Sequence, residues 1–519
     1  MHSGPFVISS LRRNCQQRPQ QTATIDAATG RQHTYAQLTD RVARLAGVLL
    51  AGGLRAGDRV GVLMLNSDVY LEAFFGVPWA GGVVLPANIR LAPPELVEVF
   101  TDAEISVLLV DETFAAVLPA IRSHIPSLQR VLYTSPGAAP AGTEGYEAAL
   151  AAAAPAPDVG RGAEDVFGLF YTGGTTGKAK GVMLTHANVM VNGLGHTAAL
   201  RYDSDSSYLH SAPMFHLADG ASSFAITMVG GTHVFIPKFD PKDMLEAIQK
   251  YKVKKAMMVP VMIQAMLAVP VTADCSSLET ILYGAAPMPE ALLTPAMARF
   301  PRAEFVQGYG MTETSPAITM LMGEEHYAGN ERMRSVGRAV SWTEVRIVDD
   351  KDQEVPRGTV GEIVTRGPHV MAGYWRKPEL TAEALRGGWM HTGDVGRMDE
   401  EGFVFICDRL KDMIITGGEN VYSAETEAAV MSFPAVALCA VIGVPDKKYG
   451  QLVTAVVQPK EGQAIDGEAL MKHCRERIAG FKCPRKVIVE TLPVSGAGKI
   501  LKHVIREKHA AGLEYTSKL

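Results

Sequence analysis

Short apolar runs separated by helical patterns are the feature that most restricts how this chain can fold. Residues 60–65, 83–85 and 105–110 are mostly apolar, as strands buried on both faces of a parallel sheet are. Ser67 is placed to cap a helix between the first two runs. The helix expected before them stops at Gly52 and has these apolar residues on one face: Leu38, Val42, Leu45, Ala46 and Leu49. Strands that alternate with helices predict an α/β fold with parallel-rich sheets.

The length and a later break in composition predict more than one domain. The chain has 519 residues, of which 47% are hydrophobic, and this exceeds what one core usually supports. An Ala-, Pro- and Gly-rich segment at residues 135–162 is typical of a surface connection. The strand-like residues 403–406 end in a charged run at 408–412, after which we expect a small α+β domain. Its expected elements are strands at residues 436–444 and 452–457 and an amphipathic helix at 469–478.

Charge and cysteine spacing disfavour several classes of protein. The formal net charge is -5, and basic residues are spread along the chain, so we expect no nucleic-acid partner. The longest uncharged stretch, residues 74–87, is too short to span a bilayer, so we expect no membrane span. The cysteines form no C-x-x-C pair or metal-finger spacing and are expected to be free thiols in a reducing compartment: Cys15, Cys275, Cys407, Cys439, Cys474 and Cys483.

The two ends of the chain bear on its location. Arg12 and Arg13 interrupt the apolar start, unlike the unbroken apolar region of a secretory signal, so we expect a cytoplasmic protein. The last residues, Ser517-Lys518-Leu519, read as a peroxisomal address in a host that has peroxisomes, and as a chance tripeptide in any other. The peroxisomal matrix is therefore the alternative location.

The strongest local motif is residues 171–181, YTGGTTGKAKG, directly after an apolar run. Its glycines let backbone N–H groups turn toward an anion, its threonines add donors and its lysines add charge. It is not a Walker loop, because only three residues separate Gly173 from Gly177 and Ala179 stands where a Ser or Thr is needed. The alternative is a flexible hairpin turn. The candidate phosphate-binding residues are Thr172, Gly173, Gly174, Thr175, Thr176, Gly177, Lys178 and Lys180.

This motif resembles the signature of the adenylate-forming superfamily, which contains acyl-CoA synthetases, peptide-synthetase adenylation domains and luciferases. The usual signature is Y-T-S-G-T-T-G-x-P-K-G, and this chain departs from it at Gly173 and Ala179. Further segments match the superfamily in its order, along almost the whole chain. The resemblance implies a large N-terminal α/β domain, a small mobile α+β C-terminal domain, and the use of ATP, Mg²⁺ and, in the CoA ligases, coenzyme A.

Two turns resemble the parts of the superfamily that hold the adenine and the metal. In residues 308–313, the resemblance places Tyr309 against the base, Thr312 on the α-phosphate and Glu313 on Mg²⁺. Mg²⁺ prefers a carboxylate oxygen beside the phosphates, and an aromatic ring offers the base a flat face. An ordinary surface carboxylate is the alternative for Glu313. The implied adenine contacts, with the small-residue turn at 284–287, are Gly284, Ala285, Ala286, Gly308, Tyr309 and Gly310.

Three later segments resemble the parts that complete the site. Asp394, in the T-G-D motif, is implied to accept hydrogen bonds from the ribose diol, where a turn or capping role is the alternative. Arg409 is implied to contact the nucleotide and Lys411 to be the hinge, where a solvated charged linker is the alternative. The implied domains are residues 1–408 and 412–519, joined by the hinge 409–411. The residues implied to line the CoA channel are Gly417, Gly418 and Glu419.

A terminal G-K motif carries the residue expected to matter most. Lys499, in residues 496–500, is implied to reach the carboxylate and the α-phosphate as the catalytic cation of the first half-reaction. A solvent-facing lysine is the alternative. With Thr312, Glu313 and His216, it makes up the expected catalytic set.

His216 matches a position between the acyl pocket and the CoA channel, with positioning of the thiol as its expected role and a buried, satisfied histidine as the alternative. Asp219 is expected to cap or face solvent, or less readily to bind a polar substrate group. The pocket has no Arg or Lys, which argues against a second substrate carboxylate. Its expected lining is His216, Ala218, Gly220, Tyr283, Met311 and Ser315.

The sequence therefore predicts an ATP-dependent acyl-CoA ligase that forms an acyl-AMP and then the thioester, with release of AMP and pyrophosphate. A medium- or long-chain fatty acid is the preferred substrate, and a cinnamic- or benzoic-type acid is the alternative. An amino-acid-activating enzyme would need an acidic residue directly after Phe215, where this chain has His216. A luciferase-like enzyme shares every motif. The expected partners are the acid, ATP and CoA, with peripheral membrane association and a homodimer left open.

Overall fold

The computed structural model describes residues 6–172, 179–270, 273–286, 288, 290–327, 329–417, 419–494 and 500–510. The chain forms two compact units. Unit 1 comprises Met1–Val345 and Thr365–Met390, and unit 2 comprises Arg346–Val364 and His391–Leu519. The predicted hinge at residues 409–411 concerns a movement, and it stays a prediction.

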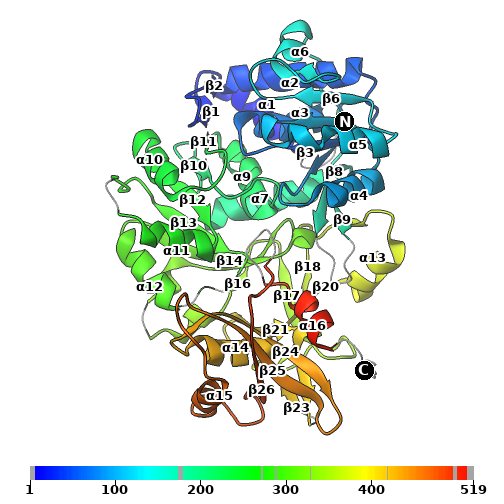
Figure 1. The fold of residues 1–519 in the computed structure, drawn as a ribbon. Coiled ribbons are helices and arrows are strands. Elements are labelled where there is room, and N and C mark those ends of the chain that lie inside the picture. Colours follow the sequence, from blue (N-terminus) through cyan, green and yellow to red (C-terminus); the bar gives the residue numbers. More distant parts are fainter. Residues whose placement is uncertain are drawn as a thin grey trace. The chain divides into compact units, whose positions relative to one another are not determined.

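An eight-stranded sheet in unit 1 follows the order β19-β9-β8-β4-β3-β5-β6-β7 (Figure 1). Its strands are β3 (Arg59–Leu63), β4 (Val83–Pro86), β5 (Ile105–Val110), β6 (Arg130–Tyr133), β7 (Glu144–Gly145), β8 (Val166–Thr172), β9 (Lys180–Thr185) and β19 (Gly373–Tyr374). Pairing is parallel from β8 to β7, whereas β9 pairs antiparallel with both β8 and β19. The three apolar runs predicted as buried strands are β3, β4 and β5.

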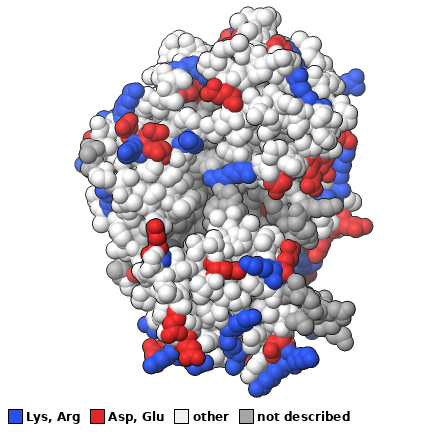
Figure 2. All heavy atoms as spheres, in the orientation of Figure 1, with Lys and Arg blue, Asp and Glu red and all other residues white. Residues whose placement is uncertain are grey.

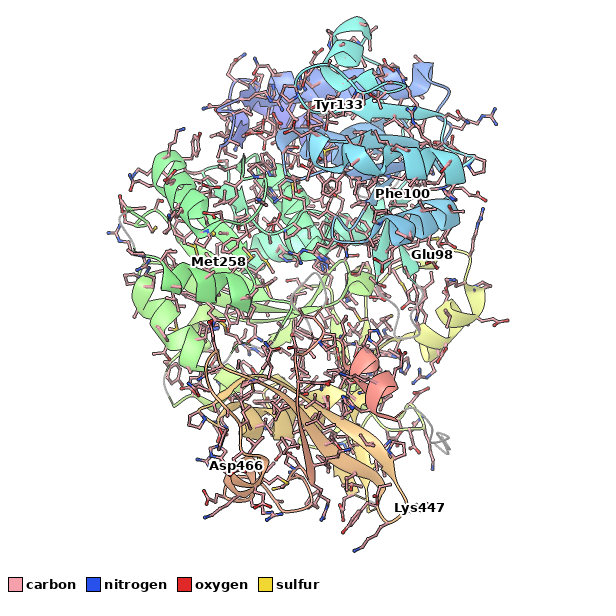
Figure 3. The ribbon with its side chains drawn as sticks, in the orientation of Figure 1. Glu98, Phe100, Tyr133, Met258, Lys447 and Asp466 are labelled. Atoms are coloured by element: carbon pink, nitrogen blue, oxygen red, sulfur yellow. The ribbon has the colours of Figure 1, made fainter. Side chains whose placement is uncertain are left out.

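Helices cover both faces of this sheet because its strands alternate between two cores. In β5, Val107 and Leu109 belong to one hydrophobic cluster and Leu108 and Val110 to another, as a repeat of two residues requires. On α4, Phe100 is buried and Glu98 is exposed (Figure 3). The helices around the sheet are α1 (Ile8–Gln17), α2 (Tyr35–Ala51), α3 (Asp68–Trp79), α4 (Pro93–Ala103), η1 (Glu112–Val117) and α5 (Leu118–His124).

The predicted helix ends in this region are confirmed. Helix α2 ends at Ala51 with Gly52 as its C-terminal cap. The Ser67 hydroxyl accepts a hydrogen bond from the Tyr70 N–H at 3.2 Å and so caps α3.

The second sheet of unit 1 has nine strands in the order β16-β15-β14-β13-β12-β10-β11-β1-β2. They are β1 (Thr22–Asp26), β2 (Gln32–Thr34), β10 (Ser207–His210), β11 (Thr232–Phe235), β12 (Lys255–Met258), β13 (Thr280–Gly284), β14 (Glu304–Gly310), β15 (Ala317–Leu321) and β16 (Arg338–Ala339). The central pairs from β1 to β14 are parallel, so their carboxyl ends share one edge. The remaining helices of unit 1 are α7 (His186–Ala199), α8 (Leu217–Gly220), α9 (Ser222–Val229), α10 (Pro241–Tyr251), α11 (Pro260–Ala268), α12 (Glu290–Arg299), η2 (Thr312–Thr314), η3 (Gly323–Glu325), η4 (Glu331–Arg334), α13 (Pro378–Ala384) and η5 (Arg386–Gly388).

The segment predicted as a surface connection, residues 135–162, contains an element that the prediction missed. Helix α6 (Tyr146–Ala152) lies within it, and Tyr146 is only 1% exposed. The Tyr146 hydroxyl donates to Glu72 Oε2 at 2.5 Å. The Ala- and Pro-rich composition concealed the helix, because one aromatic anchor and a few alanines were enough to dock it on the core.

A buried ionic network joins α2, α3 and α6. Arg31 Nε donates to Asp68 Oδ2 at 2.7 Å, and Arg41 Nε donates to Glu72 Oε1 at 2.5 Å, with both carboxylates fully buried. Burial raises the pKa of Asp68, but hydrogen bonds from His33 and Arg31 outweigh it and lower the pKa to about 2. His33, Asp68 and Glu72 are close enough to bind a cation. Because both carboxylates are already paired with arginines, we assign the cluster a structural role.

Unit 2 contains a four-stranded sheet, β17-β18-β20-β21, and a five-stranded sheet, β23-β22-β25-β24 with β26 beside β25. The strands are β17 (Glu344–Val348), β18 (Gly361–Arg366), β20 (Met390–Met398), β21 (Val404–Arg409), β22 (Ile414–Thr416), β23 (Glu419–Val421), β24 (Val436–Asp446), β25 (Gly450–Pro459) and β26 (Lys486–Val489). The unit boundaries fall inside β17 and β18 and at the start of β20. The helices are η6 (Leu410–Asp412), α14 (Ser423–Met431), α15 (Gly467–Arg475) and α16 (Lys502–Ala510). Asp466 caps α15 by accepting from the Glu468 N–H at 2.9 Å (Figure 3).

The α/β prediction is confirmed: unit 1 has two parallel-rich sheets with helices, and the C-terminal part of unit 2 is a smaller, mostly antiparallel α+β structure. On the face drawn in Figure 2, Lys and Arg side chains are interspersed with Asp and Glu side chains. None of the helices in the described ranges is both long enough and apolar enough to cross a membrane.

The Asp68 network yields a prediction about stability. Asp68→Asn leaves Arg31 without its buried counter-charge, so we expect a loss of roughly 3–5 kcal/mol in the free energy of unfolding at pH 7. The folded pKa of Asp68 lies below the ordinary value of 3.8, so the carboxylate stabilises the fold fully above about pH 5 and progressively less as pH falls toward 2. Urea unfolding at pH 7 and pH 3 should show a smaller gap between parent and variant at pH 3. An equal gap at both pH values would contradict this account.

Candidate functional site

The β8–β9 hairpin presents the predicted phosphate loop. Thr172, the last residue of β8, pairs in register with Lys180, the first residue of β9. The other loop residues predicted to bind phosphate, residues 173–178, lie outside the described residues. The hairpin therefore holds Thr172 and Lys180 side by side at the two ends of the loop.

Tyr171 ties this hairpin to helix α4. Its hydroxyl donates to the Asp102 carboxylate, and the indole N–H of Trp375 donates to the Asp102 carbonyl at 3.1 Å. Burial and then the hydrogen bond to Asp102 raise the pKa of Tyr171 well above its ordinary value, so the hydroxyl keeps its proton. The strand that leads into the loop is thus anchored from its side.

Glu313, the predicted Mg²⁺ ligand, lies beside this hairpin in η2 and is 6% exposed. The Tyr374 hydroxyl donates to Glu313 Oε1 at 2.9 Å, and the Lys180 ammonium lies 5.2 Å from the centre of the Tyr374 ring. The Met371 N–H also donates to the Glu313 carbonyl at 2.9 Å. The Glu313 carboxylate, Tyr374 and Lys180 therefore lie together beside the β8–β9 hairpin that presents the predicted phosphate loop. A surface role for Glu313 is wrong.

Tyr374 is a site residue that the sequence analysis missed. It reaches Glu313 because β19 pairs with β9, where Tyr374 lies opposite Val182. Burial, followed by the charge and the hydrogen bond of Glu313, raises the pKa of Tyr374 well above its ordinary value. The available signal was a glycine followed by two aromatic residues, Gly373-Tyr374-Trp375, outside any predicted core element.

The Glu313 surroundings suit Mg²⁺. Mg²⁺ takes oxygen ligands and is commonly held by one or two carboxylates together with substrate phosphates. Glu313 supplies a buried carboxylate, and the hydroxyl of Tyr374 orients that carboxylate without adding a competing positive charge. We find that these residues fit the ion.

The two predicted adenine segments lie at the carboxyl ends of β13 and β14, which are parallel neighbours, and residues 308–310 are the last residues of β14 rather than a turn. Gly284 pairs with Gly308, and a Cβ on Gly284 would lie 2.3 Å from the Gly308 carbonyl oxygen. A Cβ on Gly310 would lie 1.8 Å from the Pro316 carbonyl oxygen. Side chains at these two positions would force the strand ends apart. Ala285 and Ala286 are exposed at this edge, and Tyr309 is partly buried.

The predicted acyl-pocket residues lie in the same unit, with differing exposure. Tyr283 is 1% exposed, and its hydroxyl lies 2.8 Å from His326 Nε2. His326 Nδ1 faces the Met322 carbonyl at 2.8 Å and so carries the proton, which leaves Nε2 to accept from Tyr283. Ala218 and Met311 are partly buried. Gly220 packs so closely on the loop before it that a Cβ would lie 2.5 Å from the Met214 carbonyl oxygen.

His216 and Ser315 carry buried polar atoms without partners. His216 Nε2 and Ser315 Oγ have no hydrogen-bond partner among the described residues. Burial, with a smaller contribution from the charge of Arg90, lowers the pKa of His216 to about 4, so the imidazole is neutral at pH 7. The alternative of a satisfied core histidine is wrong, because an unpaired buried nitrogen is a site for a ligand hydrogen bond.

In unit 2 the predicted ribose and nucleotide residues form a pair. Asp394 of β20 lies opposite Arg409 of β21, and Arg409 Nε is 2.6 Å from Asp394 Oδ1. Asp394 lies within a strand, so the turn or capping alternative is wrong. The Thr392 hydroxyl accepts from the Asp394 N–H at 3.0 Å and donates to the Ile363 carbonyl at 2.7 Å.

The carboxylates on either side of Lys411 are fixed within unit 2. Asp408 Oδ1 accepts from the Ser423 hydroxyl at 3.0 Å, and Asp412 forms an ion pair with Arg506 of α16. Burial raises the pKa of Asp412, but the charges of Arg506 and Lys502 outweigh it and hold the pKa below its ordinary value. A solvated charged linker is therefore wrong for this segment, although Lys411 itself is exposed.

The remaining predicted residues of unit 2 lie on two turns. Gly417 has a positive φ of 61° between β22 and β23, and Glu419 begins β23; Gly418 lies outside the described residues. Lys499 also lies outside them. The structure describes the two residues that flank its segment. Val494 and Ile500 form an antiparallel bridge, and α16 follows.

Comparison with known proteins identifies the family. A family model described as AMP-binding enzyme matches residues 11–375, and one described as AMP-binding enzyme C-terminal domain matches residues 425–499. This chain belongs to the AMP-binding enzyme family. The feruloyl-CoA synthase of an Amycolatopsis species is 42% identical to it over 479 residues, 92% of this chain and 94% of that enzyme.

Two further comparisons extend over nearly the whole AMP-binding enzyme. The long-chain-fatty-acid–CoA ligase FadD13 of Mycobacterium tuberculosis is 36% identical over 96% of this chain and 98% of that ligase. The crystal structure of ATP-bound MatB from Rhodopseudomonas palustris matches with a TM-score of 0.87 and 33% identity, covering 97% of this chain and 99% of that chain. The predicted superfamily and the predicted class of enzyme, an acid–thiol ligase that uses ATP, are confirmed.

The contact between Tyr374 and Glu313 can be tested directly. Tyr374→Phe removes a hydrogen bond to a charged group, and we expect pyrophosphate exchange by this AMP-binding enzyme to slow by about 10-fold or more. Tyr146→Phe is the matched control, because it removes a tyrosine–glutamate bond of the same kind in the Asp68 network. The control should lower stability and leave the exchange rate within about twofold. Equal exchange rates in the two variants would contradict the role of Tyr374.

Proposed function

We propose that this AMP-binding enzyme activates an aromatic acid of the cinnamic type as an acyl-AMP and transfers the acyl group to coenzyme A. The observation that supports this substrate is the 42% identity to a relative named feruloyl-CoA synthase, over 92% of this chain. The sequence analysis preferred a fatty acid and kept the aromatic acid as the alternative. We place the aromatic acid first because the identity to the feruloyl-CoA synthase is the higher of the two.

A medium- or long-chain fatty acid is the second candidate. It is supported by the 36% identity to a long-chain-fatty-acid–CoA ligase over 96% of this chain. Both candidates are monocarboxylic acids. This agrees with a predicted pocket lining of small, aromatic and apolar residues without Lys or Arg, because a second carboxylate would need a cationic partner.

The first half-reaction joins two anions. A carboxylate oxygen of the acid attacks the α-phosphorus of ATP, a P–O bond forms, and pyrophosphate leaves. Thr172, Lys180 and the loop of residues 173–178 are proposed to bind the phosphates, and Thr312 the α-phosphate. Lys499 is proposed to place its ammonium between carboxylate and α-phosphate, because donors aimed at developing charge stabilise such a transition state.

Mg²⁺ at Glu313 would offset the negative charge of the phosphates as pyrophosphate leaves. The protein's part is to hold that carboxylate in a fixed orientation. Tyr374 does this with a neutral hydroxyl, and Lys180 adds a positive charge next to the ring of Tyr374.

Asp394 and Arg409 are proposed to bind the nucleotide as a pair. A carboxylate only accepts hydrogen bonds, which suits the two ribose hydroxyls. The ion pair with Arg409 at 2.6 Å directs the Asp394 carboxylate. The turns at Gly284, Ala285, Ala286 and Gly308–Gly310 are proposed to hold the adenine.

The second half-reaction replaces AMP by a thiol. The sulfur of coenzyme A attacks the acyl carbonyl, a C–S bond forms, and AMP leaves with the electrons of the broken C–O bond. We propose that unit 2 turns about Lys411, so that the loop from Gly417 to Glu419 takes the place of Lys499. His216 is proposed to position the thiol with its unpaired Nε2. Cytoplasmic location, peripheral membrane association and the homodimer stay predictions from the sequence.

A substrate panel tests the acid. With ATP, Mg²⁺ and coenzyme A, we expect thioester formation from cinnamic-type acids to have a kcat/KM at least tenfold higher than from octanoic, palmitic or benzoic acid. Thioester product and AMP should both be measured, so that adenylation alone is not counted. The highest kcat/KM for a fatty acid would favour the second candidate. Turnover of amino acids alone would contradict the proposal.

Loss of Lys499 should separate the two half-reactions. In Lys499→Ala we expect adenylate formation to fall by roughly 10²- to 10³-fold, because a preorganised cation is lost. Conversion of chemically prepared acyl-AMP and coenzyme A to thioester should stay within about threefold of the parent. Lys447→Ala, at an exposed lysine between β24 and β25 in the same unit, is the control and should leave both rates unchanged (Figure 3). Unimpaired adenylation in Lys499→Ala would contradict the assigned role.

A further inference from the structure

A loop with its two ends tied together carries His216. The loop runs from the end of β10, at His210, to Asp219 in the short helix α8. His210 Nδ1 lies 2.6 Å from Asp219 Oδ2, and both side chains are fully buried. The Tyr208 hydroxyl donates to the other oxygen of Asp219 at 3.1 Å. The expectation that Asp219 faces solvent or caps a helix is therefore wrong.

The hydrogen bonds continue beyond His210 through buried groups. His210 Nε2 lies 3.0 Å from His233 Nδ1, and His233 Nε2 lies 3.0 Å from the Thr227 hydroxyl oxygen. That hydroxyl donates to the Ser223 carbonyl at 2.7 Å. The chain of contacts joins β10, α8, β11 and α9.

The hydrogen bonds from His210 to Ser223 have one direction, in which each group donates to the next. Because Thr227 donates to Ser223, its oxygen accepts from His233 Nε2–H. Burial and the charge of His210 lower the pKa of His233 well below its ordinary value, so His233 is neutral and its Nδ1 accepts from His210. His210 therefore donates through Nε2–H, and its Nδ1 lies at hydrogen-bond distance from the Asp219 carboxyl group.

Backbone contacts make Asp219 a restraint on His216 itself. The Asp219 N–H and the Gly220 N–H donate to the His216 carbonyl at 3.1 and 2.8 Å. On the other side of the loop, Asn66 accepts from the Met214 N–H at 2.9 Å and donates to the Ala212 carbonyl at 2.8 Å. The imidazole of His216 forms no such contact, because its Nε2 has no partner among the described residues. The backbone is held while the side chain is left available.

Burying the Asp219 and His210 side chains costs free energy, because both polar groups leave water. Apolar groups of the same volume would stabilise a core as well or better, so such a pair is more readily explained by the geometry that it specifies. Here that geometry is the direction of the loop that carries His216. No other described residue of the site is linked to the buried histidines.

We propose that Asp219, acting with His210, is a positioning residue that directs His216 toward the thiol of coenzyme A. This inference rests on the proposed role of His216 in the second half-reaction. Asp219 touches no substrate, and its effect on the rate passes through His216. The same restraint orients the flanking residues Ala218 and Gly220, which are proposed to line the acyl pocket.

A double-mutant cycle tests whether Asp219 acts through His216. The parent, His216→Ala, Asp219→Asn and the double variant are each mixed with prepared acyl-AMP and coenzyme A, and single-turnover thioester formation is measured. We expect each single variant to be slower by tenfold or more, and the double variant to be no slower than His216→Ala within about twofold. Multiplied losses in the double variant would overturn the inference.

Matched variants separate positioning from general destabilisation. Asp68→Asn also removes a buried carboxylate of unit 1, and its effect on rate should multiply with that of His216→Ala. His210→Asn keeps a donor near the Nδ1 position and should retain most of the rate, whereas His210→Leu should not. If Asp219→Asn does not fold, His210→Leu takes its place in the cycle. An unchanged rate in His216→Ala would contradict the proposed role of His216, whereas a slow His216→Ala with a fast Asp219→Asn would contradict only the positioning inference.

Discussion

Carboxylates removed from water shape this molecule, because each buried charge must find donors or a counter-charge. Asp68 forms an ion pair with Arg31, and Glu72 forms one with Arg41 of α2. Glu72 of α3 also accepts a hydrogen bond from Tyr146 of α6, so these contacts join the three helices. Five further buried carboxylates lie in segments that are proposed to carry chemistry: Asp219, Glu313, Asp394, Asp408 and Asp412. Each of these partners comes from a distant part of the chain or from a neighbouring strand. The same requirement therefore assembles the core and the site.

Local pattern was enough to predict much of the fold. Strands β3, β4 and β5 follow from apolar runs, and the caps at Gly52 and Ser67 follow from residue type. Helix α6 was missed because its composition resembles a linker, and its docking depends on Tyr146 meeting a glutamate more than seventy positions earlier. A pattern read over a short window has no access to such a partner.

The candidate site likewise contains residues that local sequence could predict and residues that it could not. Residues such as Thr172, Lys180, Glu313 and Asp394 could be predicted because the superfamily's motifs are contiguous in sequence. Tyr374 could not, since it reaches Glu313 through the pairing of β19 with β9. Asp219 was visible, but its partner His210 lies in strand β10. His210 in turn contacts His233 of β11, and the parallel pairing of β10 with β11 brings the two histidines together. Strand pairing determines which distant residues become neighbours, and residue type alone does not predict that pairing.

The glycines at the carboxyl edge of β13 and β14 constrain how this edge, which is proposed to hold the adenine, can be changed by evolution or engineering. A methyl group at position 284 or 310 would collide with a backbone carbonyl, but one at Gly308 would meet only a leucine methyl at 3.5 Å, an ordinary contact. Position 308 can therefore accept a side chain, whereas positions 284 and 310 cannot without a shift of the backbone. Variants made to alter how this edge binds its ligand would do best to change residue 308 and to keep Gly284 and Gly310.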